Sequence, residues 1–142
     1  MSSRAVFYEG VLSAFGFLTS ELGFLSVVPN SESTLESVCF EKSPLFVEVG
    51  WYKGEVDVSI RVTIDTSILR PYRRKSFGVA EIAKYLKQDV FRAPAALPVS
   101  AISTDQALVC VQFYAALMKE YCQDILRGDI KTLEEIVQKE AK

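Results

Sequence analysis

The sequence contains no histidine. This absence excludes Ser-His-Asp and Cys-His catalysis, because both need an imidazole to accept the proton of the nucleophile. It also excludes metal sites built on histidine and removes the side chain that most often acts as a general base near neutral pH. Any catalysis would therefore depend on carboxylates, cysteines or cationic side chains.

Cysteine is scarce as well. The three cysteines, Cys39, Cys110 and Cys122, are odd in number and form no Cys-x-x-Cys pair, so they indicate neither a disulfide framework nor a zinc knuckle. Such usage is typical of a reducing compartment. We expect all three to be buried as small apolar side chains, since a nucleophilic cysteine without histidine would need a nearby cation or a helix N-terminus.

Several targeting and ligand signals are also missing. No apolar run reaches the roughly 18 residues of a membrane span. The apolar start of the chain is interrupted by Glu9 and Glu21, and no small-residue cleavage site follows it, so it does not fit a secretory signal. Neither GxGxxG nor GxxxxGK[ST] is present, which leaves nucleotide binding by a known loop type unsupported. We expect a cytoplasmic protein.

Apolar residues are plentiful. They make up 49% of the 142 residues, enough to form one sizeable core at a length common for one domain. We therefore expect a single domain over residues 1–142 with no obligatory cofactor and no metal site.

The first part of the chain shows a helical pattern followed by a series of strand patterns. Apolar residues at three- and four-residue steps predict an amphipathic helix ending near Gly23, with the stripe Phe7, Val11, Ala14, Phe15, Leu18 and Leu22. Four β-like runs follow, at residues 24–28, 35–40, 45–52 and 55–65.

The last two runs predict a hairpin with a defined register. A two-residue turn at Lys53-Gly54 makes one face entirely apolar, pairing Leu45 with Val62, Val47 with Ile60, Val49 with Val58 and Trp51 with Val56. The opposite face pairs Phe46 with Arg61, Glu48 with Ser59, Gly50 with Asp57 and Tyr52 with Glu55. The first face is predicted to pack in the core, and the second is predicted to be exposed to solvent or covered by a partner.

The remainder reads as loops and helices. A basic loop is expected over residues 66–76, where Arg70, Arg73, Arg74 and Lys75 gather. A short helix capped by Ser76 is expected over 79–86, and a second loop over 88–102. Ser103 and Gln106 predict a capping box for a long helix that Gly128 ends, and Asp129 caps the last helix.

This order predicts an α+β fold: an N-terminal helix, a four-stranded antiparallel meander and three C-terminal helices packed on one face of the sheet. Strands grouped together and followed by grouped helices favour this class over a parallel α/β sheet. The first and long helices are expected to lie across the apolar face of the meander.

Two groups of residues could carry a catalytic or binding function. Glu48 and Asp57 are diagonal neighbours on the polar face of the hairpin, at a separation where two carboxylates can divide acid and base roles or hold a hard cation. Alternating polar residues are, however, what any half-exposed strand shows, and a solvated face is the simpler interpretation. Residues 70–92 hold seven basic and two acidic groups with interleaved aromatics, a composition that nucleic-acid binding would use, but the acidic sheet face would repel phosphates.

A protein partner fits the residue types better than nucleic acid. Phe46, Tyr52 and Arg61 lie on the otherwise polar sheet face, and aromatic and arginine side chains are enriched in interface cores. Arg73 and Arg74 in the basic loop are a second candidate region for partner binding. A loop or helix of the same chain that covers this face would explain its aromatic and arginine residues equally well.

Three segments of the sequence look like a family of small uncharacterised bacterial α+β proteins. They are Phe46-Val47-Glu48-Val49 with its following strand, the helix of residues 77–86, and Ile125-Leu126-Arg127-Gly128-Asp129. The resemblance covers about the last two-thirds of the chain and carries over no catalytic residues. The loop between Arg92 and Ile102 is longer than the pattern of that family would lead us to expect.

Some proteins of this build resemble immunity proteins, which bind and neutralise a cognate bacterial toxin. The resemblance therefore implies function by surface complementarity without chemistry. One alternative is a chaperone of secretion that binds a disordered client, although strands would then be expected between the later helices. The other alternative is a small carboxylate- or metal-dependent enzyme that uses Glu48 and Asp57.

Overall fold

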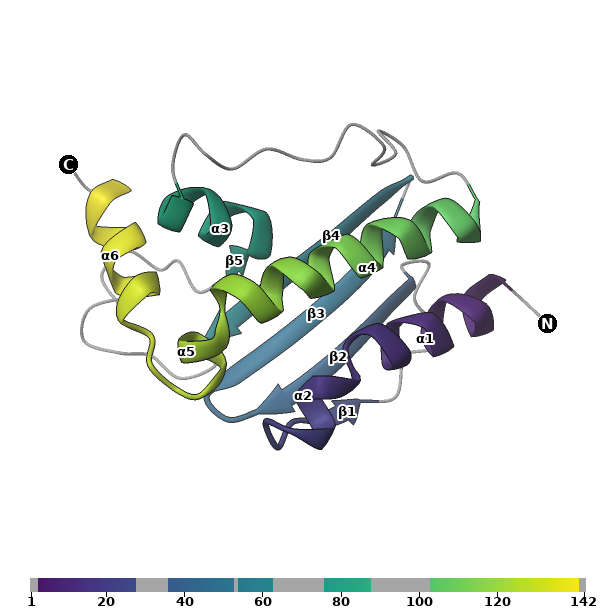
Figure 1. Ribbon diagram of the computed structural model, residues 1–142, viewed down its shortest axis with the longest axis horizontal. Coiled ribbons are helices and arrows are strands. Elements are labelled where there is room, and N and C mark those ends of the chain that lie inside the picture. The colour runs from purple at the N-terminus through teal and green to yellow at the C-terminus, as the bar shows by residue number, and fades with distance from the viewer. Residues whose placement is uncertain (1–2, 28–35, 53, 63–75, 88–102, 141–142) are drawn as a thin grey trace.

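The computed structural model describes residues 3–27, 36–52, 54–62, 76–87 and 103–140 (Figure 1). The described elements, in chain order, are α1 (Ser3–Ala14), α2 (Gly16–Ser20), β1 (Leu25–Val27), β2 (Glu36–Lys42), β3 (Leu45–Tyr52), β4 (Glu55–Val62), β5 (Ser76–Gly78), α3 (Val79–Lys87), α4 (Thr104–Tyr121), α5 (Gln123–Leu126) and α6 (Lys131–Glu140). The fold is α+β with an antiparallel sheet, as predicted.

The sheet has five strands in the order β1-β2-β3-β4-β5, each antiparallel to its neighbour. The prediction of four strands was wrong, because β5 is only three residues long and lies between the basic segment and a helix, too short to show alternation. Ser76 is consequently a strand residue rather than a helix cap. The predicted register of the β3–β4 hairpin is confirmed at every pair from Leu45↔Val62 to Tyr52↔Glu55.

The helices also differ from the expected set. The first amphipathic stretch divides into α1 and α2, because the backbone of Phe15 departs from helical geometry (φ −101°, ψ 14°). The long helix ends at Tyr121, and Cys122 (φ −112°, ψ 10°) separates it from the short helix α5. Four helices therefore follow the sheet in the described part of the chain, where three were expected.

The helix caps predicted at Ser103 and Asp129 are present, whereas Gly128 follows the short helix α5 and does not end the long helix. The Ser103 hydroxyl accepts a hydrogen bond from the Gln106 amide at 3.2 Å, and the Ser103 amide donates to the Gln106 side chain at 3.1 Å, which completes the capping box. The carboxylate of Asp129 accepts from the Lys131 amide at 3.1 Å at the start of α6. Gly128 adopts the positive φ of 111° that ends the preceding helical segment.

The core lies between the sheet and the helices. Helices α1 and α4 lie across one face of the sheet, in front of it in Figure 1. The Phe7 ring of α1 lies 5.4 Å from that of Trp51 on β3, and the Phe15 ring lies 6.3 Å from that of Phe40 on β2. Every buried side chain in the described ranges is apolar, so burial of apolar area is what fixes this arrangement.

Helix α6 departs from the expectation that all the C-terminal helices rest on the sheet. Its main contacts are with α3 and α5. Leu133, Ile136 and Val137 form its buried stripe, and the Tyr85 hydroxyl of α3 donates to the Glu135 carboxylate at 3.1 Å. None of the described helices is long and apolar enough to cross a membrane.

Helices α1 and α4 are in close contact at Gly10. A methyl group added there would overlap the side chain of Leu108 on α4. Alanine gains about 1 kcal/mol of helix propensity over glycine, but overpacking of this kind costs about 1–3 kcal/mol. We expect Gly10→Ala to lower the free energy of unfolding, measured by urea denaturation, by about 1 kcal/mol.

Gly16 provides the matched control, because a methyl group added there meets nothing within 4 Å. Gly16→Ala is expected to leave stability unchanged or to raise it. Leu108→Ala should remove most of the cost of Gly10→Ala in a double-mutant cycle. A Gly10→Ala protein as stable as Gly16→Ala would contradict the close approach of the two helices.

Candidate functional site

The sheet has a second face, opposite α1 and α4, which we call the outer sheet face. Strand alternation places ten described residues of β2, β3 and β4 there: Ser37, Cys39, Glu41, Phe46, Glu48, Gly50, Glu55, Asp57, Ser59 and Arg61. All are half-buried or exposed, whereas the alternate residues of β4, which point to the core, are all buried. The described helices therefore leave this face open.

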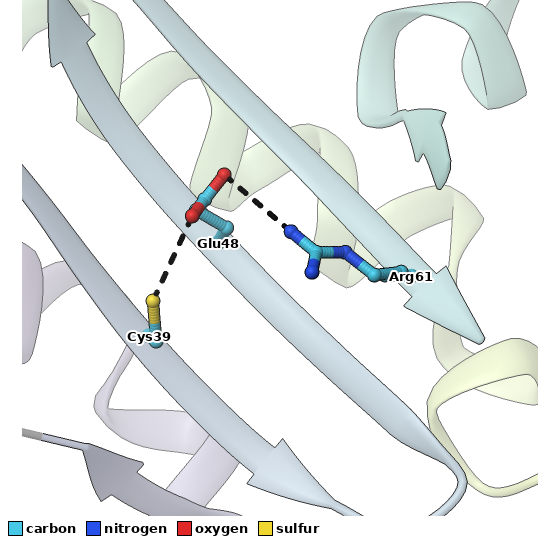
Figure 2. A network of polar contacts seen from close by, with 3 residues as sticks. All are labelled: Cys39, Glu48 and Arg61. Atoms are coloured by element: carbon cyan, nitrogen blue, oxygen red, sulfur yellow. Dashed lines mark hydrogen bonds and ion pairs between the residues drawn. The ribbon is translucent and has the colours of Figure 1, made fainter. Parts of the chain in front are cut away.

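Three residues from neighbouring strands form a polar network on this face (Figure 2). A carboxylate oxygen of Glu48 lies 4.0 Å from the Arg61 guanidinium, and the other accepts from the Cys39 thiol at 3.9 Å. Glu48 on β3 is thus held between β2 and β4. At these separations the network orients the side chains and contributes little stability, because the ion pair is partly exposed to water.

Arg61 also covers Phe46. The guanidinium carbon lies 5.1 Å from the centre of the Phe46 ring, and the two residues are directly opposed across the β3–β4 pair. This distance is within the range of cation–π attraction. The side chain of Arg61 nevertheless remains 47% exposed, so its donors are accessible from outside the sheet.

Cys39 was expected to be buried, and this prediction was wrong. It is half-buried on the outer sheet face, because residues of β2 alternate between the core and this face, and Val38 and Phe40 take the core positions. Partial burial raises the pKa of its thiol from 9.0 to about 11, and the nearby Glu48 carboxylate adds to the rise while Arg61 opposes it. Cys110 and Cys122 are buried, as expected.

The carboxylates Glu48 and Asp57 lie at diagonal positions, as the confirmed register requires. Glu48, however, interacts with Arg61 and Cys39, and Asp57 is exposed on β4 opposite Gly50. No group of three or more potential metal ligands comes together among the described residues. The arrangement thus links Glu48 to a cation and a thiol rather than to the second carboxylate.

The other predicted site residues are placed only in part. Tyr52 pairs with Glu55 through its backbone at the end of β3, but its side chain lies outside what the structure describes. Arg73 and Arg74 fall in residues 63–75, which are outside the described ranges as well. Of the aromatics offered for nucleic-acid stacking, Phe77 is fully buried in the core and Tyr85 contacts Glu135 and Lys139.

The role of Cys39 was missed from the sequence. The two strands β2 and β3 are joined by the two-residue turn Ser43-Pro44, which pairs Lys42 with Leu45 and therefore Cys39 with Glu48. Applying the same register argument to this turn as to Lys53-Gly54 would have placed the thiol beside the carboxylate.

Three comparisons with known proteins gave no match. No protein-family model, no curated protein and no solved structure matches the chain. The arrangement of residues on the outer sheet face is therefore the basis for assigning a function.

Proposed function

We propose that the chain is a protein-binding module of the immunity type, which neutralises a cognate bacterial toxin by covering it. The outer sheet face is the binding surface, and the observation that carries the proposal is the Arg61–Phe46 pair on that face. Aromatic and arginine side chains are enriched in the cores of protein interfaces, and arginine is among the residues that most often carry their binding energy.

The network around Arg61 supports this role. Glu48 and the Phe46 ring hold the guanidinium from two sides, so less side-chain freedom is lost when a partner docks. The face is a backbone-paired sheet whose reverse side is the core, and such a surface changes little in shape on binding. Binding of this kind needs no catalytic group, which is consistent with a chain without histidine.

Arg73 and Arg74 are proposed as a second contact region, and the bacterial cytoplasm as the place of action. A basic segment that follows β4 in the sequence would speed association with an acidic region of the partner. The contribution of these residues should be seen as a dependence of the association rate on ionic strength.

The test is capture of partners from a lysate of the source cell, with the purified protein as bait at low and then high salt. We expect one stoichiometric protein that is lost, or bound at least about tenfold more weakly, with Phe46→Ala/Arg61→Ala, because truncating central interface residues typically costs more than about 1–2 kcal/mol. Direct titration of the purified partner measures the change in affinity.

The matched control is Val109→Ala/Gln112→Ala, two exposed residues on helix α4, away from the outer sheet face. The control should bind as well as the wild type. A partner that is retained by Phe46→Ala/Arg61→Ala and lost with the α4 variant would overturn the proposal, and so would the absence of any captured protein.

A further inference from the structure

We infer that the partner presents a basic surface, whose lysine or arginine side chains bind Glu48 and Asp57 beside the Arg61–Phe46 pair. This inference deepens the proposed function and rests on it. It concerns the chemistry of the partner, which the proposal of a binding module leaves open.

The charge of the outer sheet face favours such a partner. Its described charged residues are the four acids Glu41, Glu48, Glu55 and Asp57 and the single base Arg61. Only Glu48 is close to Arg61, and no ion pair joins the other three acids to a base within the described part of the chain. An excess of one sign on an open face attracts a partner surface of the opposite sign.

The residues directly opposite the two carboxylates are short, whereas Arg61 and Phe46 lie to one side of Glu48. Asp57 is opposite Gly50, which in turn is opposite Ser37, and Glu48 lies between Cys39 and Ser59. Because none of these side chains reaches above the carboxylates, a long cationic side chain can approach both from outside. Diagonal positions lie about 7–8 Å apart, which the fork of one arginine or two neighbouring lysines can span.

The same charges argue against other occupants. A second copy of this chain would set acidic groups against acidic groups, and juxtaposed like charges at an interface are costly. Nucleic acid would place phosphates against the carboxylates. A basic protein surface is the occupant that pairs with the acids and still leaves Arg61 stacked on Phe46.

The inference is tested with two synthetic peptides of equal length, one alternating Lys and Tyr and the other alternating Glu and Tyr. Each is titrated into the isotope-labelled protein while amide chemical shifts are followed by NMR. We expect the Lys-Tyr peptide to bind about tenfold more tightly than the Glu-Tyr peptide, with the largest shifts at Gly50, Asp57 and Ser59.

Two variants locate the effect. Glu48→Gln/Asp57→Asn should weaken Lys-Tyr binding about tenfold and reduce its salt dependence, and Asp57→Asn alone, which leaves the Glu48–Arg61 pair intact, should weaken it about threefold. The control Glu9→Gln/Glu21→Gln removes the same charge from exposed positions on the α1–α2 side of the fold and should bind like the wild type. Equal loss in both double variants would show unspecific charge attraction and overturn the inference.

The inference and the proposed function fail in different ways. Tighter binding of the Glu-Tyr peptide, or a captured partner that needs Phe46 and Arg61 but is unaffected by Glu48→Gln/Asp57→Asn, overturns the basic partner and leaves the binding module standing. A captured partner that is insensitive to Phe46→Ala/Arg61→Ala overturns the binding face itself.

Discussion

Phe40→Ala is expected to lower the free energy of unfolding by about 3–5 kcal/mol, as is typical when a fully buried phenylalanine is truncated. Phe40 is 0% exposed, lies on β2 opposite Ser26 and Val47, and packs against the ring of Phe15. Its removal leaves a cavity where the helices meet the sheet. Since domains of this size are stable by only about 5–15 kcal/mol, the loss should be evident as a large shift of the urea midpoint.

Phe46→Ala is the matched control for this prediction. The same substitution on the next strand removes a ring from the outer sheet face, where Phe46 is only half-buried and contacts Arg61. We expect a cost below about 1 kcal/mol, the size of a partly exposed cation–π contact. Equal costs for Phe40→Ala and Phe46→Ala would mean that the two faces of the sheet do not differ in burial as described.

The sequence predicted the centre of the sheet because the physical signal there is strong. Shifting β4 by one residue along β3 would move Val58, Ile60 and Val62 from the core to the outer face, so the alternation of apolar and polar residues specifies the register. Gly54, at φ 81°, supplies the positive backbone angle that the two-residue turn requires. The caps at Ser103 and Asp129 were predictable for a similar reason, because one side chain satisfies one free backbone amide.

The missed elements depend on contacts distant in sequence. Strand β5 exists because Phe77 reaches the core beside Ile60, and a three-residue run carries no period of its own. The break between α4 and α5 falls at Cys122, which continues the apolar stripe and is itself buried. The stripe therefore predicted an uninterrupted helix, since periodicity reports which residues face the core and not where the backbone bends.

The candidate site was predictable in its parts but not in its connections. Alternation placed Phe46, Glu48 and Arg61 on one face, as the structure confirms. The stacking of Arg61 on Phe46 depends on the choice of side-chain rotamer, which the strand pattern does not specify. The contact between Glu48 and Cys39 depends on the β2 register, which follows only when the Ser43-Pro44 turn is considered together with the strands. Long side chains such as Arg have several low-energy rotamers, and the neighbours on adjacent strands select among them.

Cys39 is expected to react with iodoacetamide about a hundredfold more slowly than an ordinary exposed cysteine between pH 7 and 8. Only the thiolate is nucleophilic, and a pKa raised from 9.0 to about 11 reduces the thiolate fraction about a hundredfold at these pH values. The sign follows from both main causes: burial and the Glu48 carboxylate each disfavour the negative form. The rate should therefore rise about tenfold per pH unit and level off only near pH 11.

The measurement is alkylation of the folded protein followed peptide by peptide with mass spectrometry, with the protein unfolded in guanidinium chloride as the reference. Glu48→Gln removes the adjacent negative charge and should speed the reaction of Cys39 several-fold without restoring the unfolded rate, because the burial remains. Arg61→Gln should slow it, since the guanidinium lowers the pKa of the thiol. Opposite responses to these two substitutions are what an electrostatic network predicts. An increase in both variants would instead mean that the outer sheet face protects Cys39 by covering it.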